Sequence, residues 1–105
     1  LEELLQATCG WRMTFWELMK VGERRIIMMR VINQLRGIDA SADALPDRMF
    51  EPLPDGPTEG RCVDRRRFAE ALGDYYEMIG CERQSGHPTR GKLLELALDW
   101  IAERE

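Results

Sequence analysis

The sequence predicts an all-α fold, a small helical domain arranged around one long central helix. Three observations lead to this class. Apolar residues recur at helical spacing over residues 18–35, and the segments after Asp64 and Thr89 repeat this spacing behind good capping residues. Four prolines fall within residues 38–63, where an ordinary helix cannot continue. We therefore expect a single helical domain over residues 1–105, with a long Pro-rich irregular strap and two further helices.

The chain is expected to open on the end of a helix. Leu1, Leu4 and Leu5 share one helical face, and Gly10 interrupts the pattern. So short a helix is not stable in water by itself. We interpret the stub as the last turns of a longer helix, and the whole sequence as a fragment of a longer chain.

The central helix is expected from Thr14 to Arg36. Thr14 and Glu17 have the spacing of a capping box, in which each side chain accepts from the backbone N–H of the other residue. Beyond Ile26 the apolar side chains spread around most of the circumference, so we expect neighbours on several sides. Gly37 is a natural left-handed cap that ends the helix.

Residues 38–63 are expected to form an ordered, irregular strap. Apolar residues recur along it, and its prolines restrict the unfolded backbone. A loop of this length inside a small domain usually has a function. Two interpretations remain open: the strap covers the core of its own domain, or it docks on a neighbour that the sequence does not contain.

Two shorter helices are expected after the strap. Asp64 caps the first, and Thr89 caps the second, which is expected to continue to Ile101. Tyr75 and Tyr76 are adjacent on the first helix and point about 100° apart. We expect one ring in the core and the other at its rim, with a substrate contact as the alternative.

Composition narrows the class of function. Fifteen Lys and Arg residues stand against 19 Asp and Glu residues, and the net charge of −4 argues against non-specific binding to nucleic acid. We interpret the run Arg65 to Arg67 as a solvated helix face or as partners in salt bridges, with an anion site as the alternative. The three cysteines form no closed disulfide framework, so a reducing, cytoplasmic compartment is expected. The apolar runs are too short for a membrane span, and no signal peptide is expected.

The residue pattern offers no self-contained catalytic or metal-binding constellation. Structural zinc sites place their ligands in close pairs, whereas Cys9, Cys62, Cys81 and His87 are separated by 53, 19 and 6 residues. Cys81 and His87 could serve as nucleophile and base only with a third orienting group, and none is evident. We therefore predict no catalytic, cofactor-binding or metal-ligating residue in this sequence.

Glu23 and Arg24 interrupt the apolar central helix. A charge buried there without a partner is unfavourable by several kcal/mol. Each is therefore expected to be paired, either within this chain or with the surface of an absent partner.

The order of many short motifs resembles that of a known family. The motifs are Gly10-Trp11, Thr14, Glu17-Leu18, Gly22-Glu23-Arg24, Asn33, Gly37, Asp43, Leu45-Pro46, Arg48, Glu51-Pro52-Leu53-Pro54, Gly56-Pro57, Gly60, Val63-Asp64, Tyr75-Tyr76, Gly80, Gly86, Pro88-Thr89, Lys92-Leu93 and Glu95-Leu96. In this order they resemble the C-terminal segment of tungsten-dependent aldehyde:ferredoxin oxidoreductases. The chain departs from that pattern at Ile27, Leu35-Arg36 and Ala42, as a divergent subgroup would.

The resemblance implies a parent enzyme that oxidises aldehydes to carboxylic acids and passes electrons to ferredoxin. It implies that upstream domains of the same polypeptide hold tungsten on a bis-pterin (molybdopterin-type) cofactor and a 4Fe-4S iron-sulfur cluster. This segment would then pack on the cofactor domain, shield the cluster and shape the substrate channel, without activity of its own. Its candidate inter-domain contacts are Glu23, Arg24, Asn33, Arg48 and Tyr76. The alternative is a free-standing helical protein-interaction module that catalyses no reaction.

Overall fold

The computed structural model describes residues 1–102, and in these residues the chain is all-α, as predicted. The elements in chain order are α1 (Glu2–Cys9), α2 (Phe15–Leu35), the 3₁₀ turns η1 (Ala40–Ala42) and η2 (Asp47–Phe50), α3 (Arg65–Met78), α4 (Arg90–Glu95) and α5 (Asp99–Ala102). The β pairing in these residues is one isolated bridge between Cys81 and Pro88.

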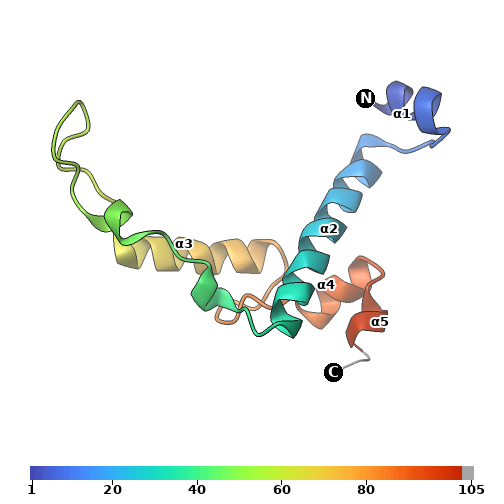
Figure 1. Cartoon of the computed structure of the whole chain (residues 1–105). Helices are drawn as coiled ribbons and strands as arrows, with labels where there is room; N and C mark the ends of the chain where they lie inside the picture. The colour runs from blue at the N-terminus through green and yellow to red at the C-terminus, as the bar shows by residue number, and fades with distance from the viewer. Residues whose placement is uncertain (103–105) are drawn as a thin grey trace.

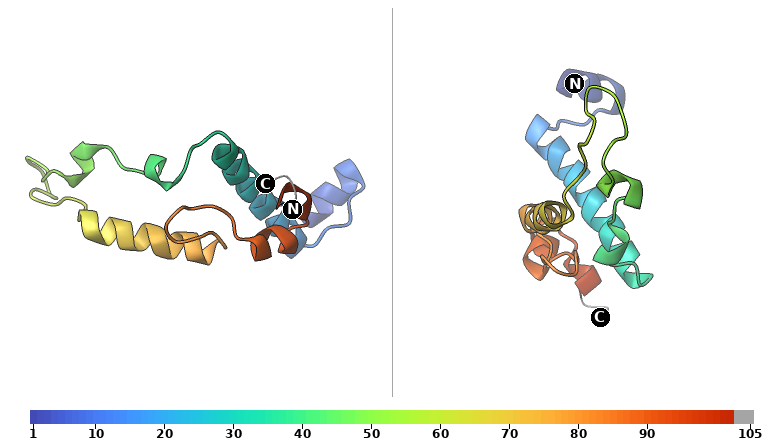
Figure 2. Two further views of the ribbon diagram at one scale, coloured as in Figure 1. Left: turned by 90° about the horizontal axis from the view of Figure 1, so that it is seen from below. Right: turned by 90° about the vertical axis from the view of Figure 1, so that its left-hand side faces the viewer.

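The chain is elongated. Figure 1 shows α2 and α3 diverging from a shared end, with α4 and α5 beside α2, and the two views of Figure 2 show the same open arrangement. The radius of gyration is 18.6 Å, whereas a compact domain of this length has about 13 Å. The accessible surface is 8377 Å², about 2,300 Å² more than a folded monomer of this mass exposes. The helices therefore do not close into a compact domain.

Local capping fixes the ends of α2. The Glu17 N–H donates to Thr14 Oγ1 at 3.2 Å, and the Thr14 N–H donates to Glu17 Oε2 at 2.8 Å, so the predicted capping box is confirmed. At the other end Gly37 has a φ of 73°, the left-handed conformation that a helix stop favours.

The core lies where α2 meets the end of α3 and the start of α4. Its buried side chains come from three regions of the chain: Ile27, Val31, Tyr76, Cys81, Leu93, Leu96 and Leu98. Of the adjacent tyrosines, Tyr76 is 1% exposed and Tyr75 is 45% exposed, so the prediction of one core ring and one rim ring is confirmed.

The expectation that α2 has neighbours on several sides is not met within this chain. Ile27 and Val31 are its buried residues, whereas Val21, Met29 and Ile32 on the other side remain about half-exposed. The periodicity indicated correctly that this helix is apolar around most of its circumference. It could not indicate which faces the chain itself covers.

The strap is ordered by its own backbone. The Leu53 N–H donates to the Arg61 carbonyl at 3.1 Å, and the Gly60 N–H donates to the Leu53 carbonyl at 2.9 Å, so residues 53–61 form a narrow ribbon. An edge-to-face contact between Phe50 and Phe68, 6.0 Å between ring centroids, joins the base of the ribbon to α3. Ala40 packs on the core, while residues 51–62 are exposed. The first part of the strap covers its own domain, and the ribbon does not.

The prediction of one helix from Thr89 to Ile101 is wrong, because the chain turns at Ala97. Ala97 has a φ of 52°, and the Leu98 N–H donates to the Leu93 carbonyl at 2.7 Å, which ends α4. In a continuous helix Leu98 would point about 140° away from Leu93. The turn instead brings Leu98 back into the core, where it is fully buried.

Substitution of Ala97 by glycine should stabilise the chain by about 1 kcal/mol, because glycine adopts the left-handed conformation without the strain of a β-carbon. Ala71→Gly, at an exposed position inside α3, should destabilise it by about 1 kcal/mol. Urea unfolding followed by circular dichroism measures both. Equal destabilisation by the two variants would contradict the strained turn.

Candidate functional site

The most prominent surface feature is a set of large apolar side chains on α2 that the chain leaves uncovered. Helical geometry places Val21, Met29 and Ile32 on the side opposite Ile27, and Ile26 borders them. We call these four residues, Val21, Ile26, Met29 and Ile32, the apolar α2 face. Each is between 46% and 53% exposed, and soluble monomers rarely expose a large contiguous apolar patch.

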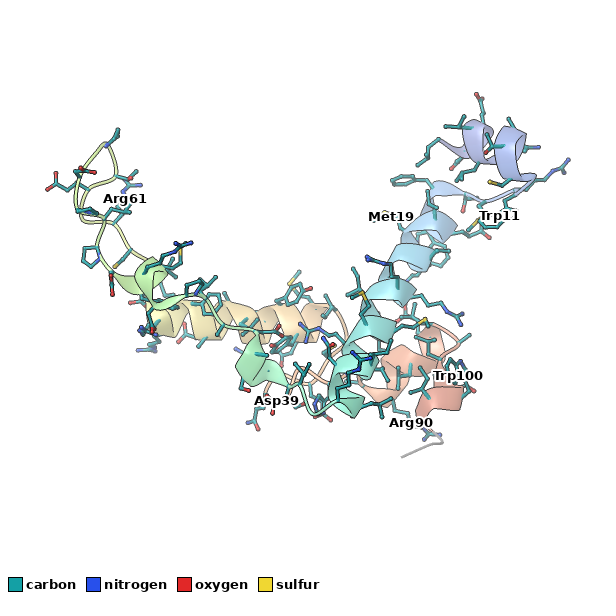
Figure 3. All side chains as sticks on the ribbon, in the orientation of Figure 1. Trp11, Met19, Asp39, Arg61, Arg90 and Trp100 are labelled. Carbon is teal, nitrogen blue, oxygen red and sulfur yellow. The ribbon has the colours of Figure 1, made fainter. Side chains whose placement is uncertain are left out.

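The apolar surface continues toward α1. Figure 3 shows Trp11 and Met19 at the α1 end of the molecule, far from the strap ribbon marked by Arg61. Trp11, Phe15, Trp16 and Met19 are each more than half exposed. Aromatic and Met side chains are enriched in the centres of protein interfaces. This end of the chain therefore has the composition of an interface.

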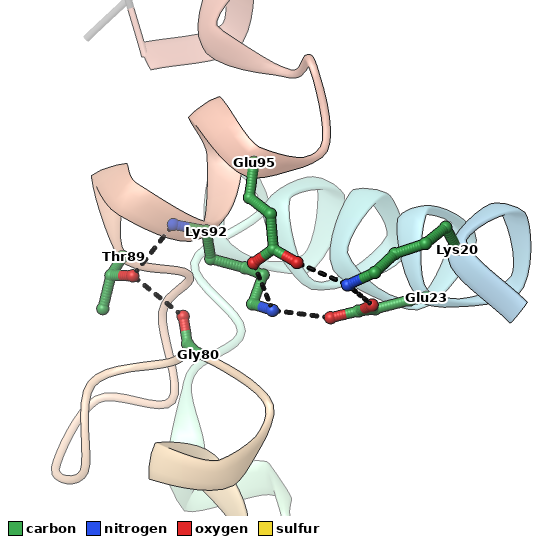
Figure 4. A network of polar contacts seen from close by, with 6 residues as sticks. All are labelled: Lys20, Glu23, Gly80, Thr89, Lys92 and Glu95. Carbon is green, nitrogen blue, oxygen red and sulfur yellow. Dashed lines mark hydrogen bonds and ion pairs between the residues drawn. The ribbon is translucent and has the colours of Figure 1, made fainter. Parts of the chain in front are cut away.

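Four charged side chains hold α2 against α4 (Figure 4). Glu23 accepts from Lys20 at 2.7 Å and from Lys92 at 2.6 Å, and Glu95 accepts from Lys92 at 2.7 Å and also from Lys20. The four residues form a closed ring of alternating charge, which we call the α2–α4 ion-pair network. Networks of this kind stabilise more than isolated surface pairs do.

The network shifts the ionisation of its members. Hydrogen bonds from Lys20 and Lys92 lower the pKa of Glu95 to about 2 and also lower the pKa of Glu23. In return, the hydrogen bonds to Glu23 and Glu95 raise the pKa of Lys92 and of Lys20. All four side chains are therefore charged over a wide range of pH.

Gly80 leaves room for the Lys92 side chain. A β-carbon at Gly80 would lie 2.3 Å from Lys92 Cε, and the φ of Gly80 is 80°. Its carbonyl accepts from the Thr89 hydroxyl at 3.1 Å, and the same hydroxyl accepts from the Lys92 N–H at 3.2 Å (Figure 4). The turn after α3 thus caps α4 and positions the network at the same time.

A second polar cluster joins α2, the strap and α3. Asp43 accepts from Arg30 at 2.8 Å and from the Tyr76 hydroxyl at 2.6 Å, and the Arg30 guanidinium lies 4.9 Å from the centroid of the Tyr76 ring. Burial and donation to Asp43 raise the pKa of Tyr76 to about 12. Burial opposes ionisation of Asp43, but the bonds from Tyr76 and Arg30 outweigh it and leave the pKa of Asp43 below its ordinary value.

The five predicted inter-domain residues lie in different environments in the structure. Glu23 is paired inside the chain, in the α2–α4 ion-pair network, and Tyr76 is buried beside Asp43. Arg24 is half-buried and makes no ion pair within residues 1–102. Asn33, in the last turn of α2, and Arg48, in η2, are exposed. A contact between any of these and another domain remains a prediction.

Sequence reasoning did not predict the cluster that Arg30 forms with Asp43 and Tyr76. Arg30 could have been found, because it interrupts the same apolar helix that drew attention to Glu23 and Arg24. Asp43 carried no local signal of its pairing, since its partners are 13 and 33 residues away.

The residues do not supply a ligand set for the tungsten or cluster that the resemblance implies. Within residues 1–102 no group of three or more His, Cys, Asp or Glu side chains converges on one point. Cys9 and Cys62 are exposed and Cys81 is buried, and burial raises the pKa of the Cys81 thiol, which disfavours the thiolate. His87 is half-buried in the turn after α3.

Two hollows lie on either side of the Trp16 and Lys20 side chains. The first, of about 490 Å³, is lined mainly by apolar side chains of α2 together with Ile79. The second, of about 580 Å³, includes Arg24 and the turn at Leu96. Both are open to solvent. None of the described helices is long and apolar enough to cross a membrane.

Comparison with known proteins gives a consistent result. A family model described as "Aldehyde ferredoxin oxidoreductase, domains 2 & 3" matches residues 1–98. The tungsten-containing aldehyde ferredoxin oxidoreductase of Pyrococcus furiosus is 38% identical over 98 residues, or 91% of this chain, and that of Pyrococcus abyssi is 35% identical over 99 residues, or 92% of it. The aliphatic sulfonate oxidoreductase, WOR-like subunit, of Pyrococcus furiosus is 34% identical over 86 residues, or 77% of the chain and 14% of that relative. The chain spans 16% of the length of the two aldehyde oxidoreductases.

Acid should weaken the contact between α2 and α4 through Glu95. A carboxylate whose pKa is depressed on folding stabilises the fold above its unfolded pKa, about 4.3, and this stabilisation is lost as pH falls toward 2. Between pH 5 and about pH 2.5 the urea midpoint should therefore fall less for Glu95→Gln than for the unchanged chain. Glu59→Gln, on the exposed strap ribbon, is the control and should behave as the unchanged chain does. An equal fall of the urea midpoint for all three proteins would show that Glu95 does not contribute to the loss of stability in acid.

Proposed function

The chain belongs to the aldehyde ferredoxin oxidoreductase family, and from this premise we propose that it is a helical structural part of a tungsten-containing oxidoreductase, not a module that acts alone. The parent enzyme would oxidise aldehydes to carboxylic acids in the cytoplasm and pass the electrons to ferredoxin. In it, this segment would pack on the domain that binds the pterin cofactor, shield the iron-sulfur cluster and form part of the substrate channel.

The observation that carries the proposal is the surplus of exposed surface, on which many large apolar side chains lie. The chain exposes about 2,300 Å² more than a compact monomer of its mass. An obligate interface buries about 1,000–2,500 Å² on each partner and is as apolar as a domain core cut in half. The apolar α2 face and the aromatic residues near α1 supply surface of that kind, and the relatives contain several hundred further residues that could cover it.

The relatives favour an aldehyde as the substrate. The names of two relatives from Pyrococcus species state that they are tungsten-containing and that they act on aldehydes, while that of a third states aliphatic sulfonates. Identity to the aldehyde enzymes is slightly higher and covers more of this chain. The chemistry would reside in residues outside this chain, because residues 1–102 offer no convergent metal ligands, and no catalytic step is assigned to them.

Met29→Asp should destabilise the full-length polypeptide, because docking would bury an unpaired carboxylate at the apolar α2 face, at a cost of several kcal/mol. Met78→Asp is the matched control, since Met78 lies on α3 and is 85% exposed. Thermal unfolding and the content of tungsten and iron in the purified protein measure both. If Met29→Asp unfolds and binds metal as the control does, the face is not an internal interface and the free-standing module becomes the better explanation.

Arg24→Ala should have little effect on the isolated chain, because Arg24 makes no ion pair within residues 1–102. In the full-length polypeptide it should cost about 1–3 kcal/mol, the usual penalty when the partner of a buried charge is removed. Urea unfolding of the isolated chain and thermal unfolding of the parent make the comparison. A large loss in the isolated chain would place the partner of Arg24 within this segment.

A further inference from the structure

The hollow beside Gly22 has the features of a binding site for another segment of the protein. Gly22 lies in the middle of α2, where glycine is unfavourable compared with alanine. Its φ is not in the left-handed region, and a β-carbon there would meet no atom within 4 Å in the part of the chain that the structure describes. Neither the backbone nor the packing of this chain therefore requires a glycine at this position.

The surroundings of Gly22 are apolar and concave. It lines the hollow of about 490 Å³ together with Leu18, Met19, Ile26 and Ile79, which come from α2 and from the end of α3. A glycine on a helix allows another backbone to approach more closely than any other residue does. The missing side chain and the concave wall thus favour the same event, the close approach of a neighbouring segment.

The charges at the hollow indicate what that segment carries. Three charged residues line it: Lys20, Glu23 and Arg25. Lys20 and Glu23 are satisfied by the α2–α4 ion-pair network, whereas Arg25 makes no ion pair within residues 1–102. The unsatisfied charge at the rim is therefore positive.

The region around α2 is also positively charged. Residues 10–37 contain six Lys and Arg residues but two carboxylates, a net charge of +4, whereas the whole chain has −4. Both carboxylates are already engaged, Glu17 in the capping box and Glu23 in the ion-pair network. A partner that covers this surface is complementary if it brings carboxylates.

We propose that the hollow at Gly22 binds a segment from the rest of the same polypeptide. This segment is apolar where it contacts Gly22 and carries a carboxylate that pairs with Arg25. This inference rests on the proposed function, because it takes the occupant from the parent enzyme. It goes further in naming the contact point, the need for glycine there and the charge of the occupant.

The test compares two glycines of the same kind in the full-length polypeptide. Gly91 is also helical and has no positive φ. A β-carbon added at Gly91 would meet no atom within 4 Å in the described part of the chain. Gly91→Ala should slow cleavage by a protease at a fixed elevated temperature or leave its rate unchanged. Gly22→Ala should accelerate cleavage about fivefold, since the added methyl group displaces the seated segment. If Gly22→Ala protects the protein as Gly91→Ala does, the close approach does not occur.

A charge variant tests the second part of the inference. Arg25→Gln should accelerate cleavage of the full-length polypeptide, and the difference from the unchanged protein should shrink at 1 M salt. Arg67→Gln is the control, on an exposed position of α3 with no ion pair in the described residues. Equal rates for the two variants would overturn the carboxylate pairing.

The outcomes separate this inference from the proposed function. If Met29→Asp destabilises the parent enzyme but Gly22→Ala does not, the apolar α2 face is still an interface, and the proposed binding of a segment at Gly22 is wrong. If neither does, the proposed function fails as well. If Gly22→Ala changes the oligomeric state in light scattering and not the protease resistance of the subunit, the occupant is a second copy of the protein and the inference is overturned.

Discussion

The contact of Ile27 and Val31 with the buried residues after α3 is the constraint on which the rest of this structure depends. It joins α2 to Leu93 and Leu98, more than 60 residues away in sequence. Without it α2 would be an isolated helix, and helical stability in water comes mainly from packing of an apolar face. The helices α3 and α4 are positioned against α2 by this contact.

The polar clusters sit at the two sides of that contact and orient it. The α2–α4 ion-pair network lies on one side, and the cluster of Arg30, Asp43 and Tyr76 lies on the other. Apolar packing is not directional, whereas paired charges and hydrogen bonds fix register. A helix that is apolar around most of its circumference has many ways to pack, so such fixed points decide which face turns inward and which remains for a partner.

What could be predicted from the sequence was local. The capping box at Thr14, the cap at Asp64 and the stop at Gly37 each depend on residues a few positions apart, and the structure confirms them. The break at Ala97 could not be predicted, because it is the burial of Leu98 that favours the turn over the helical propensity of the segment. The pairing of Lys92 with Glu23 spans 69 residues, and nothing in the spacing of the sequence encodes it.

The same argument explains why the pattern on α2 suggested more neighbours than the chain provides. Periodicity reports how much apolar surface a helix carries, but not which molecule or segment covers it. A chain with so open a shape and so small a core would, under the proposed function, gain much of its stability from surface that it shares with the rest of the parent enzyme. Its folding would then be linked to that contact, because an interaction made by the folded form and not by the unfolded form stabilises the fold. On the proposed function, loss of the contact at the apolar α2 face would therefore destabilise this segment within the parent enzyme.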